Sequence, residues 1–139
     1  MTRRPLIAAG GVSTPDGVAG ALRSGADAVS VGTALLLTPE SGASPTYQRA
    51  LLDGRFTRTV VTRAFTGRPA RALSNDFTER HTPSAPSGYP ALHHLTSPLR
   101  RAASAAGDAN RLHLWAGTGH RHIPTGDTQR VLAHLASAT

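Results

Sequence analysis

Two short apolar runs near the start of the chain flank a segment with helical spacing. Residues 5–12 (PLIAAGGV) are almost entirely apolar, and residues 26–37 (ADAVSVGTALLL) form a second such run. Continuous apolar runs of this length are typical of parallel strands, which are buried on both faces. Between them, Val18, Ala21 and Leu22 recur at the spacing of one helix face. The pattern therefore predicts strand, crossover helix and strand, with the two strands parallel.

The helix between the two runs has clear start and stop signals. Ser13 or Thr14 can cap its first turn, Pro15 suits the first helical position, and Asp16 favours the positive end of the helix dipole. Gly25 is placed to end the helix in a left-handed conformation.

The pattern after Thr38 is less regular and mostly helical, so we predict two domains, residues 1–37 and residues 38–139. The second domain is predicted to hold a helix from Ser44-Pro45 to Gly54, a strand over 57–65, a turn at 67–71, a short helix from about Ala72 to Arg80, a loop over 81–90, a helix that Ser97-Pro98 starts and Gly107 closes, and a last helix over 129–136.

Composition excludes several classes of function. The net charge is +7 and all fifteen basic residues are arginine, but they are scattered from Arg3 to Arg130 without a basic stripe, which argues against a nucleic-acid partner. The chain has no cysteine, so disulfides, thiolate metal sites and cysteine catalysis are excluded. No apolar run reaches the roughly 18 residues of a membrane span. We predict a soluble, cytoplasmic protein that contacts neither membranes nor nucleic acids.

Glycines follow both predicted strands. Gly10-Gly11 comes after the first strand and Gly32-Thr33 after the second, so both turns open on the same edge of a parallel sheet. Backbone N–H groups exposed there can bind an anion without any basic side chain, although glycines also serve simply to allow tight turns. In (β/α)8 barrels, the loops after strands 7 and 8 frequently hold a phosphate. Two such turns on successive strands therefore indicate a phosphate site.

Four segments resemble the C-terminal part of the nitronate monooxygenases, formerly called 2-nitropropane dioxygenases. They are LIAAGGVSTPDG with its following SVGT, TRAFTGRPAR, YPALHHLTSPLR and the WAG loop at residues 115–117. The resemblance implies an α/β fold, namely the last βαβ portion of a TIM (β/α)8 barrel followed by a mostly helical cap segment. It also implies an FMN-dependent enzyme that oxidises alkyl nitronates with O2.

The resemblance places the FMN phosphate on backbone amides of the last two βα turns. Carried over to this sequence, the cofactor-binding residues are Gly10, Gly11, Ser30, Val31, Gly32 and Thr33. The histidine that serves as catalytic base in the family would precede Met1, so the catalytic residue is expected outside this chain. We therefore expect a truncated chain whose partner is the missing N-terminal barrel half. Thr118-Gly119 also departs from the family pattern, in which a glutamine follows Gly117.

The seven histidines are interpreted as surface or loop residues. Adjacent His93 and His94 point in different directions on a predicted helix, and His120 and His122 lack a third ligand, so no metal site is predicted. Besides the nitronate monooxygenase, two alternatives stay open. One is a catalytically silent fragment that binds FMN or phosphate. The other is a flavin-dependent enoyl-acyl-carrier-protein reductase with NAD(P)H as donor.

Overall fold

The computed structural model describes residues 4–139 and divides the chain after residue 42 and after residue 117. The first unit combines the N-terminal residues up to Gly42 with Thr118–Thr139, and the second unit is the continuous segment Ala43–Gly117. Residues 1–3 of the first predicted domain lie outside the described residues. The predicted boundary between residues 37 and 38, which separates barrel strands from cap segment, stays a prediction.

The first unit contains the strand, crossover helix and strand that the sequence predicts. Strands β1 (Ile7–Ala9) and β2 (Ala28–Ser30) are parallel, with Ala8 paired to Val29 and Ala9 to Ser30. Helix α1 (Pro15–Arg23) connects them. Thr14 Oγ1 caps this helix by accepting a hydrogen bond from Gly17 N at 3.1 Å. The second strand is shorter than predicted, because a 3-10 turn, η1 (Thr33–Leu35), replaces its second half.

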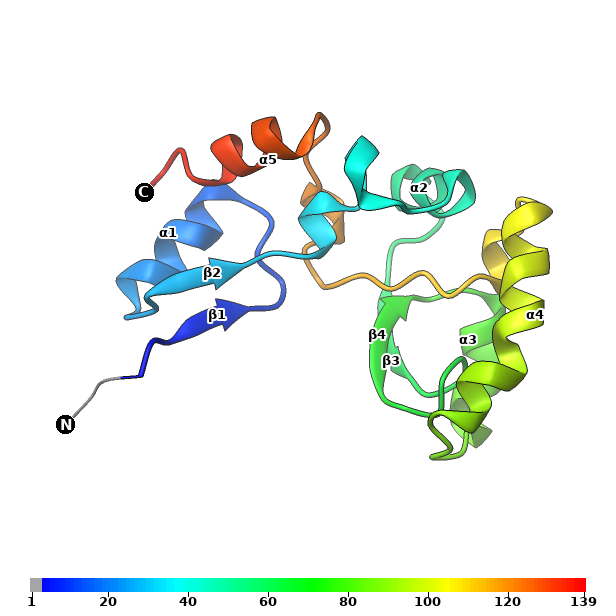
Figure 1. Ribbon diagram of the computed structural model, residues 1–139. Coiled ribbons are helices and arrows are strands. Elements are labelled where there is room, and N and C mark those ends of the chain that lie inside the picture. Colours follow the sequence, from blue (N-terminus) through cyan, green and yellow to red (C-terminus); the bar gives the residue numbers. More distant parts are fainter. Residues whose placement is uncertain (1–3) are drawn as a thin grey trace. The chain divides into compact units, whose positions relative to one another are not determined.

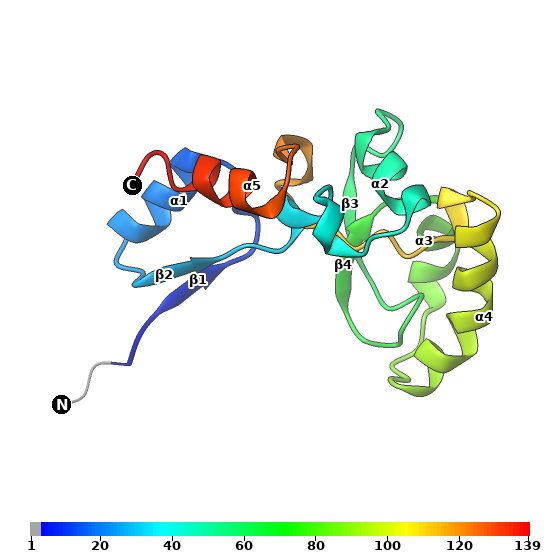
Figure 2. The same cartoon turned by 45° about the horizontal axis from the view of Figure 1, so that its top comes forward.

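Three further short helices complete the first unit: η2 (Pro39–Ser41), η5 (His120–His122) and α5 (Thr128–Leu135). Helices α1 and α5 lie side by side on one face of the two strands (Figure 2). The buried side chains of Val18, Ala34, Val131 and Leu135 form the core of this unit. At the start of α5, Glu40 Oε2 accepts a hydrogen bond from Thr128 Oγ1 at 3.1 Å, which ties η2 to the last helix.

The strands of the first unit are covered on one face alone. Val29 packs towards the core, whereas Ile7, Ala9, Ala28 and Ser30 on the other face are exposed, Ile7 to 60%. Within residues 4–139 the sheets are two-stranded and no closed barrel forms. The predicted parallel pair is confirmed. No helix in this part is both long and apolar enough to cross a membrane.

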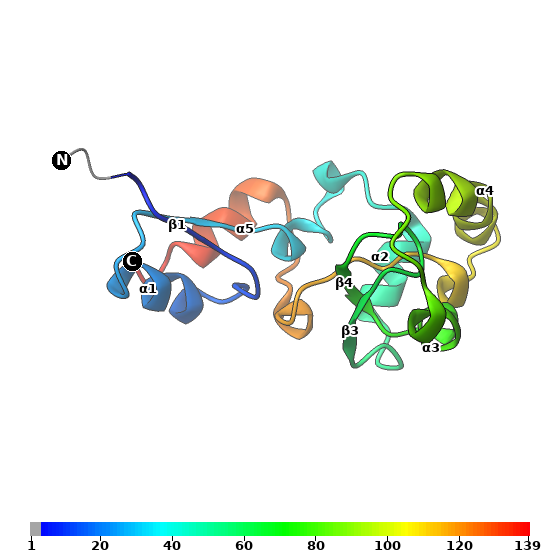
Figure 3. The same ribbon diagram turned by 90° about the horizontal axis from the view of Figure 1, so that it is seen from below.

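The second unit consists of a β-hairpin with helices packed beside it. Strands β3 (Thr59–Thr62) and β4 (Ala70–Leu73) are antiparallel, and Figures 1 and 3 show α3 (Asp76–His81) and α4 (Ala91–Ala105) on the same side of the hairpin. Helix α2 (Pro45–Leu52) and the 3-10 turns η3 (Thr82–Ser84) and η4 (Ala109–Arg111) complete the unit.

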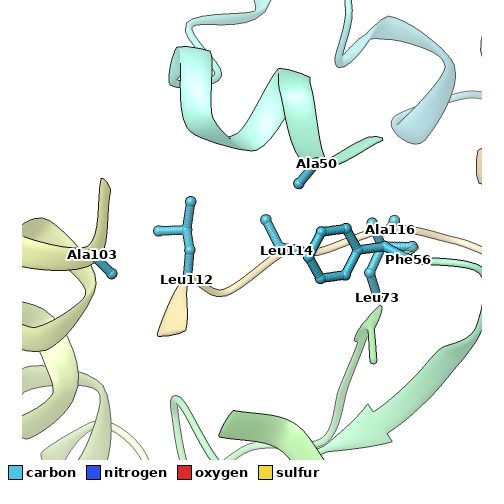
Figure 4. Packing of buried hydrophobic residues seen from close by; sticks show 7 residues of the cluster. All are labelled: Ala50, Phe56, Leu73, Ala103, Leu112, Leu114 and Ala116. Carbon is cyan, nitrogen blue, oxygen red and sulfur yellow. The ribbon is translucent and has the colours of Figure 1, made fainter. Parts of the chain in front are cut away.

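A later segment of the chain runs along β4 and closes the core of the second unit. Leu73 N donates to Leu114 O at 2.8 Å, and Ala116 N donates to Arg71 O at 3.2 Å. These bonds carry Leu114 into the buried cluster, whose side chains converge from separate elements (Figure 4). The cluster consists of Ala50, Phe56, Leu73, Ala103, Leu112, Leu114 and Ala116.

Two sequence predictions in this unit are wrong. Residues Ala70–Leu73 form β4 instead of the end of a turn and the start of a helix, and the following helix begins at Asp76 because Asn75 caps it. Helix α4 begins at Ala91, well before the predicted start at Ser97-Pro98. Pro98 lies on its exposed face, while the buried residues Thr96, Arg100 and Ala103 continue the inner face past the proline. Burial of that face outweighs the hydrogen bond that Pro98 cannot donate.

Candidate functional site

The two glycine turns leave the sheet at the same edge. Because Ala9 is paired with Ser30, the carboxyl ends of β1 and β2 are aligned. Gly10 and Gly11 have φ angles of 93° and 74°, a left-handed region that strongly favours glycine. Gly10, Gly11, Ser30 and Gly32 are exposed, while Val31 and Thr33 are half-buried. All six predicted cofactor-binding residues thus lie in two adjacent turns of the first unit.

Gly32 differs from the glycines of the first turn. It precedes η1 with a φ of −120°, which any residue adopts, and no described atom lies within 4 Å of the position that a Cβ would take. Neither backbone conformation nor packing within the described part of the chain requires glycine here. The backbone at Gly32 is therefore open to the close approach of a bound molecule.

A third segment lies against the first turn. A Cβ on Gly11 would come within 2.8 Å of Thr118 Oγ1, and a Cβ on Gly119 would come within 2.7 Å of Gly11 O and closer still to Ser13 Oγ. Thr118 and Gly119 therefore pack directly on the Gly10-Gly11 turn. Thr118 and Gly119, which depart from the family pattern, thus lie at the site although they were not among the residues predicted for it.

His120 follows this segment and is buried, with 6% of its surface exposed. Neither ring nitrogen has a hydrogen-bond partner among the described residues. The turn η5 that His120 begins packs against η1, which follows Gly32. The interpretation of every histidine as a surface or loop residue is therefore wrong for His120, whereas His122 is exposed. No three His, Cys, Asp or Glu side chains of residues 4–139 gather as a metal ion would require.

A second polar cluster lies in the second unit, around Arg100. This side chain is 8% exposed; its Nη2 donates to His93 O at 2.8 Å, and its Nη1 lies 3.5 Å from His113 Nε2. Burial, helped by the positive charge of Arg100, lowers the pKa of His113 to about 4. His113 is therefore neutral near pH 7, and so low a pKa makes it a weak general base. The sequence did not reveal this cluster, because His113 reaches Arg100 only through the fold of the segment that follows α4.

Comparisons with known proteins point to one family. The family model for nitronate monooxygenase matches residues 3–134. A probable nitronate monooxygenase of Staphylococcus aureus (strain Newman) is 35% identical over 134 residues, which cover 94% of this chain and 38% of the relative. A probable nitronate monooxygenase of Staphylococcus saprophyticus is 39% identical over 122 residues, which cover 86% of this chain and 34% of the relative.

Solved structures give the same likeness. The nitroalkane oxidase of Streptomyces ansochromogenes matches with a TM-score of 0.93 and 51% identity, over 99% of this chain and 41% of the other. FabK of Thermotoga maritima matches with a TM-score of 0.76 and 27% identity, over 96% of this chain and 43% of the other. The chain thus spans about two fifths of the length of the proteins it matches.

Proposed function

The chain belongs to the nitronate monooxygenase family, and from this premise we propose that it forms the phosphate-binding edge of an FMN-dependent enzyme that oxidises alkyl nitronates with O2. In this proposal, the part of each relative that the chain matches is the phosphate-binding end of the enzyme. The catalytic base belongs to the remaining part, the N-terminal barrel half, which is the proposed partner. FMN would supply the electron transfer between nitronate and O2.

Six residues of this chain would hold the FMN phosphate: Gly10, Gly11, Ser30, Val31, Gly32 and Thr33. Their support is geometric, because the paired ends of β1 and β2 bring both turns to one edge. Backbone N–H groups in left-handed turns and at the start of a helical turn are suited to bind an anion. Thr33 adds a hydroxyl that can donate to a phosphate oxygen.

The single observation that carries this proposal is the empty space beside Gly32. A Cβ there would meet no described atom within 4 Å and would impose no backbone strain. Replacing Gly32 by alanine should therefore leave the fold unchanged and obstruct a phosphate that approaches the backbone.

The test compares Gly32→Ala with Gly20→Ala, because Gly20 lies in α1 and a Cβ there would also meet no described atom within 4 Å beyond its own helix backbone and chain neighbours. FMN affinity is measured by quenching of flavin fluorescence. Loss of hydrogen bonds to a charged phosphate should weaken FMN binding by about tenfold or more in Gly32→Ala. Gly20→Ala should bind FMN as the parent chain does. Equal FMN affinity in Gly32→Ala and the parent would refute the proposed phosphate site. A parent chain that binds no FMN would refute the proposal that this chain binds FMN.

The likeness to FabK favours a second candidate, a flavin-dependent enoyl-acyl-carrier-protein reductase that uses NAD(P)H. The higher identity to the nitroalkane oxidase favours nitronate as substrate. An assay of the chain with FMN and its N-terminal half would separate them. Nitronate-dependent O2 uptake supports the first function, and enoyl-thioester-dependent NAD(P)H oxidation supports the second. FMN binding without either turnover would support the silent fragment.

A further inference from the structure

Among the described residues of the first unit, the fully buried side-chain polar atoms that have no hydrogen-bond partner belong to His120. Both Nδ1 and Nε2 are buried, and neither makes a hydrogen bond. A neutral imidazole carries one N–H donor and one acceptor, and burying them unpaired costs free energy. Because buried polar atoms are nearly always hydrogen-bonded, we expect these two ring nitrogens to have a partner outside the described residues.

The neighbours of His120 fix its position beside the two glycine turns. The preceding residue, Gly119, lies so close to Gly11 O that a Cβ there would come within 2.7 Å of that atom. On its other side, η5 packs against η1, which begins at Thr33. The backbone of residues 118–122 therefore passes between the turn after β1 and the turn after β2 (Figure 1).

The groups around this edge are matched to a ligand that accepts hydrogen bonds. The turns offer backbone N–H groups, and the residues that form them, from Gly10 to Gly11 and from Val31 to Thr33, carry no charge. No acidic side chain joins a histidine cluster within the described range, so a metal ion lacks its ligands. A phosphate is rich in acceptor oxygens, and an imidazole N–H is a donor for one of them.

We propose that His120 donates a hydrogen bond to the phosphate bound at the two glycine turns, as a side-chain contact from a third segment of the chain. This proposal rests on the proposed function and adds to it a residue outside the two strand-end turns. His120 holds the phosphate and takes no part in the oxidation. The close fit of Gly119 against Gly11 keeps the imidazole in place.

The first arm of the test is a substitution series that separates donor chemistry from packing. His120→Leu removes the donor and keeps much of the volume, whereas His120→Asn and His120→Gln keep an N–H at a shorter or longer reach. His122→Gln is the matched control, because His122 lies in the same turn and is exposed. Inorganic phosphate and then FMN are titrated into each variant. We expect about a tenfold loss of affinity in His120→Leu, partial recovery in one amide variant, and no change in His122→Gln.

The second part of the test measures the parent chain itself and so does not depend on whether a variant folds. In the parent chain with 15N-labelled histidine, addition of inorganic phosphate should shift the ring-nitrogen signals of one histidine, and His120→Asn or His120→Gln should lack those signals. A parent chain that binds phosphate without a shift of His120, or His120→Leu with unchanged affinity, would overturn this inference and leave the proposed function standing. A parent chain that binds neither phosphate nor FMN would overturn both.

Discussion

Replacing Asn75 by alanine tests how the second unit holds together. The Asn75 side chain is buried and makes three hydrogen bonds: Oδ1 accepts from Thr78 N at 3.0 Å, and Nδ2 donates to Ala109 O at 2.9 Å and to Leu112 O at 2.8 Å. It therefore caps α3 and at the same time fixes the segment that leads into the buried cluster. Loss of the cap costs about 1 kcal/mol. Loss of two buried bonds to carbonyls costs about 1 kcal/mol each.

The expected result for Asn75→Ala is a fall of about 3 kcal/mol in the free energy of unfolding, the sum of these terms. Urea unfolding followed by the fluorescence of Trp115, the single tryptophan, measures it, because Trp115 lies in the same unit. Asn75→Asp separates the two roles, since it keeps the capping oxygen and turns a second oxygen towards the two carbonyls. Asn75→Asp should therefore also be strongly destabilised.

Asn110→Ala is the matched control for this prediction. The side chain of Asn110 is half-buried in the same unit and makes no hydrogen bond among the described residues, so its removal should change the free energy of unfolding by less than about 0.5 kcal/mol. If Asn75→Ala changed it as little as Asn110→Ala, or if Asn75→Asp were as stable as the parent, the bridging role of Nδ2 would be refuted.

Two further predictions concern the other polar cluster and the glycine loop. The pKa of His113, about 4, lies below its ordinary value of 6.5, so the unfolded chain binds the proton more tightly. The second unit should therefore be most stable above about pH 6.5 and become less stable as the pH falls towards 4. Urea unfolding across this range should show a weaker pH dependence in His113→Gln than in the parent chain. An equal dependence in both would contradict the lowered pKa of His113. Gly119→Ala would bring a Cβ within 2.7 Å of Gly11 O, and it should destabilise the first unit by about 1–3 kcal/mol. Thermal unfolding followed by circular dichroism would test this against Gly20→Ala, and an unchanged melting temperature in Gly119→Ala would show that the loop relaxes.

The strand, helix and strand of the first unit could be predicted from the sequence because their signals are local. A short apolar run, a Thr14-Pro15 helix start and a second apolar run follow one another closely, and each element pairs with its neighbour in sequence. Strand β4 could not be predicted in this way. Its sequence, ARAL, has little intrinsic preference for a strand, and its extended form depends on pairing with β3 and with Leu114.

The candidate site shows the same division between local and distant signals. The aligned turns at Gly10-Gly11 and Gly32-Thr33 follow from the parallel pairing, which the sequence predicts. The approach of Gly119 to Gly11 joins distant parts of the chain. No periodicity marks it, because Thr118-Gly119 and the short turn η5 that follows have no hydrophobic repeat. The burial of His120 depends on that approach and could not be foreseen.

The division of the chain into an interrupted first unit and a continuous second unit has a consequence for synthesis. The core of the first unit unites Val18 and Ala34 with Val131 and Leu135, so its last two members leave the ribosome only after the whole second unit. Residues 43–117 emerge without interruption and can fold while the ribosome is still at work. During that interval α1 has no helix α5 to cover it, and the exposed Leu6 and Ile7 add to the uncovered apolar surface. During synthesis, the apolar surface of α1 and of Leu6 and Ile7 therefore needs protection until the segment after residue 117 has emerged.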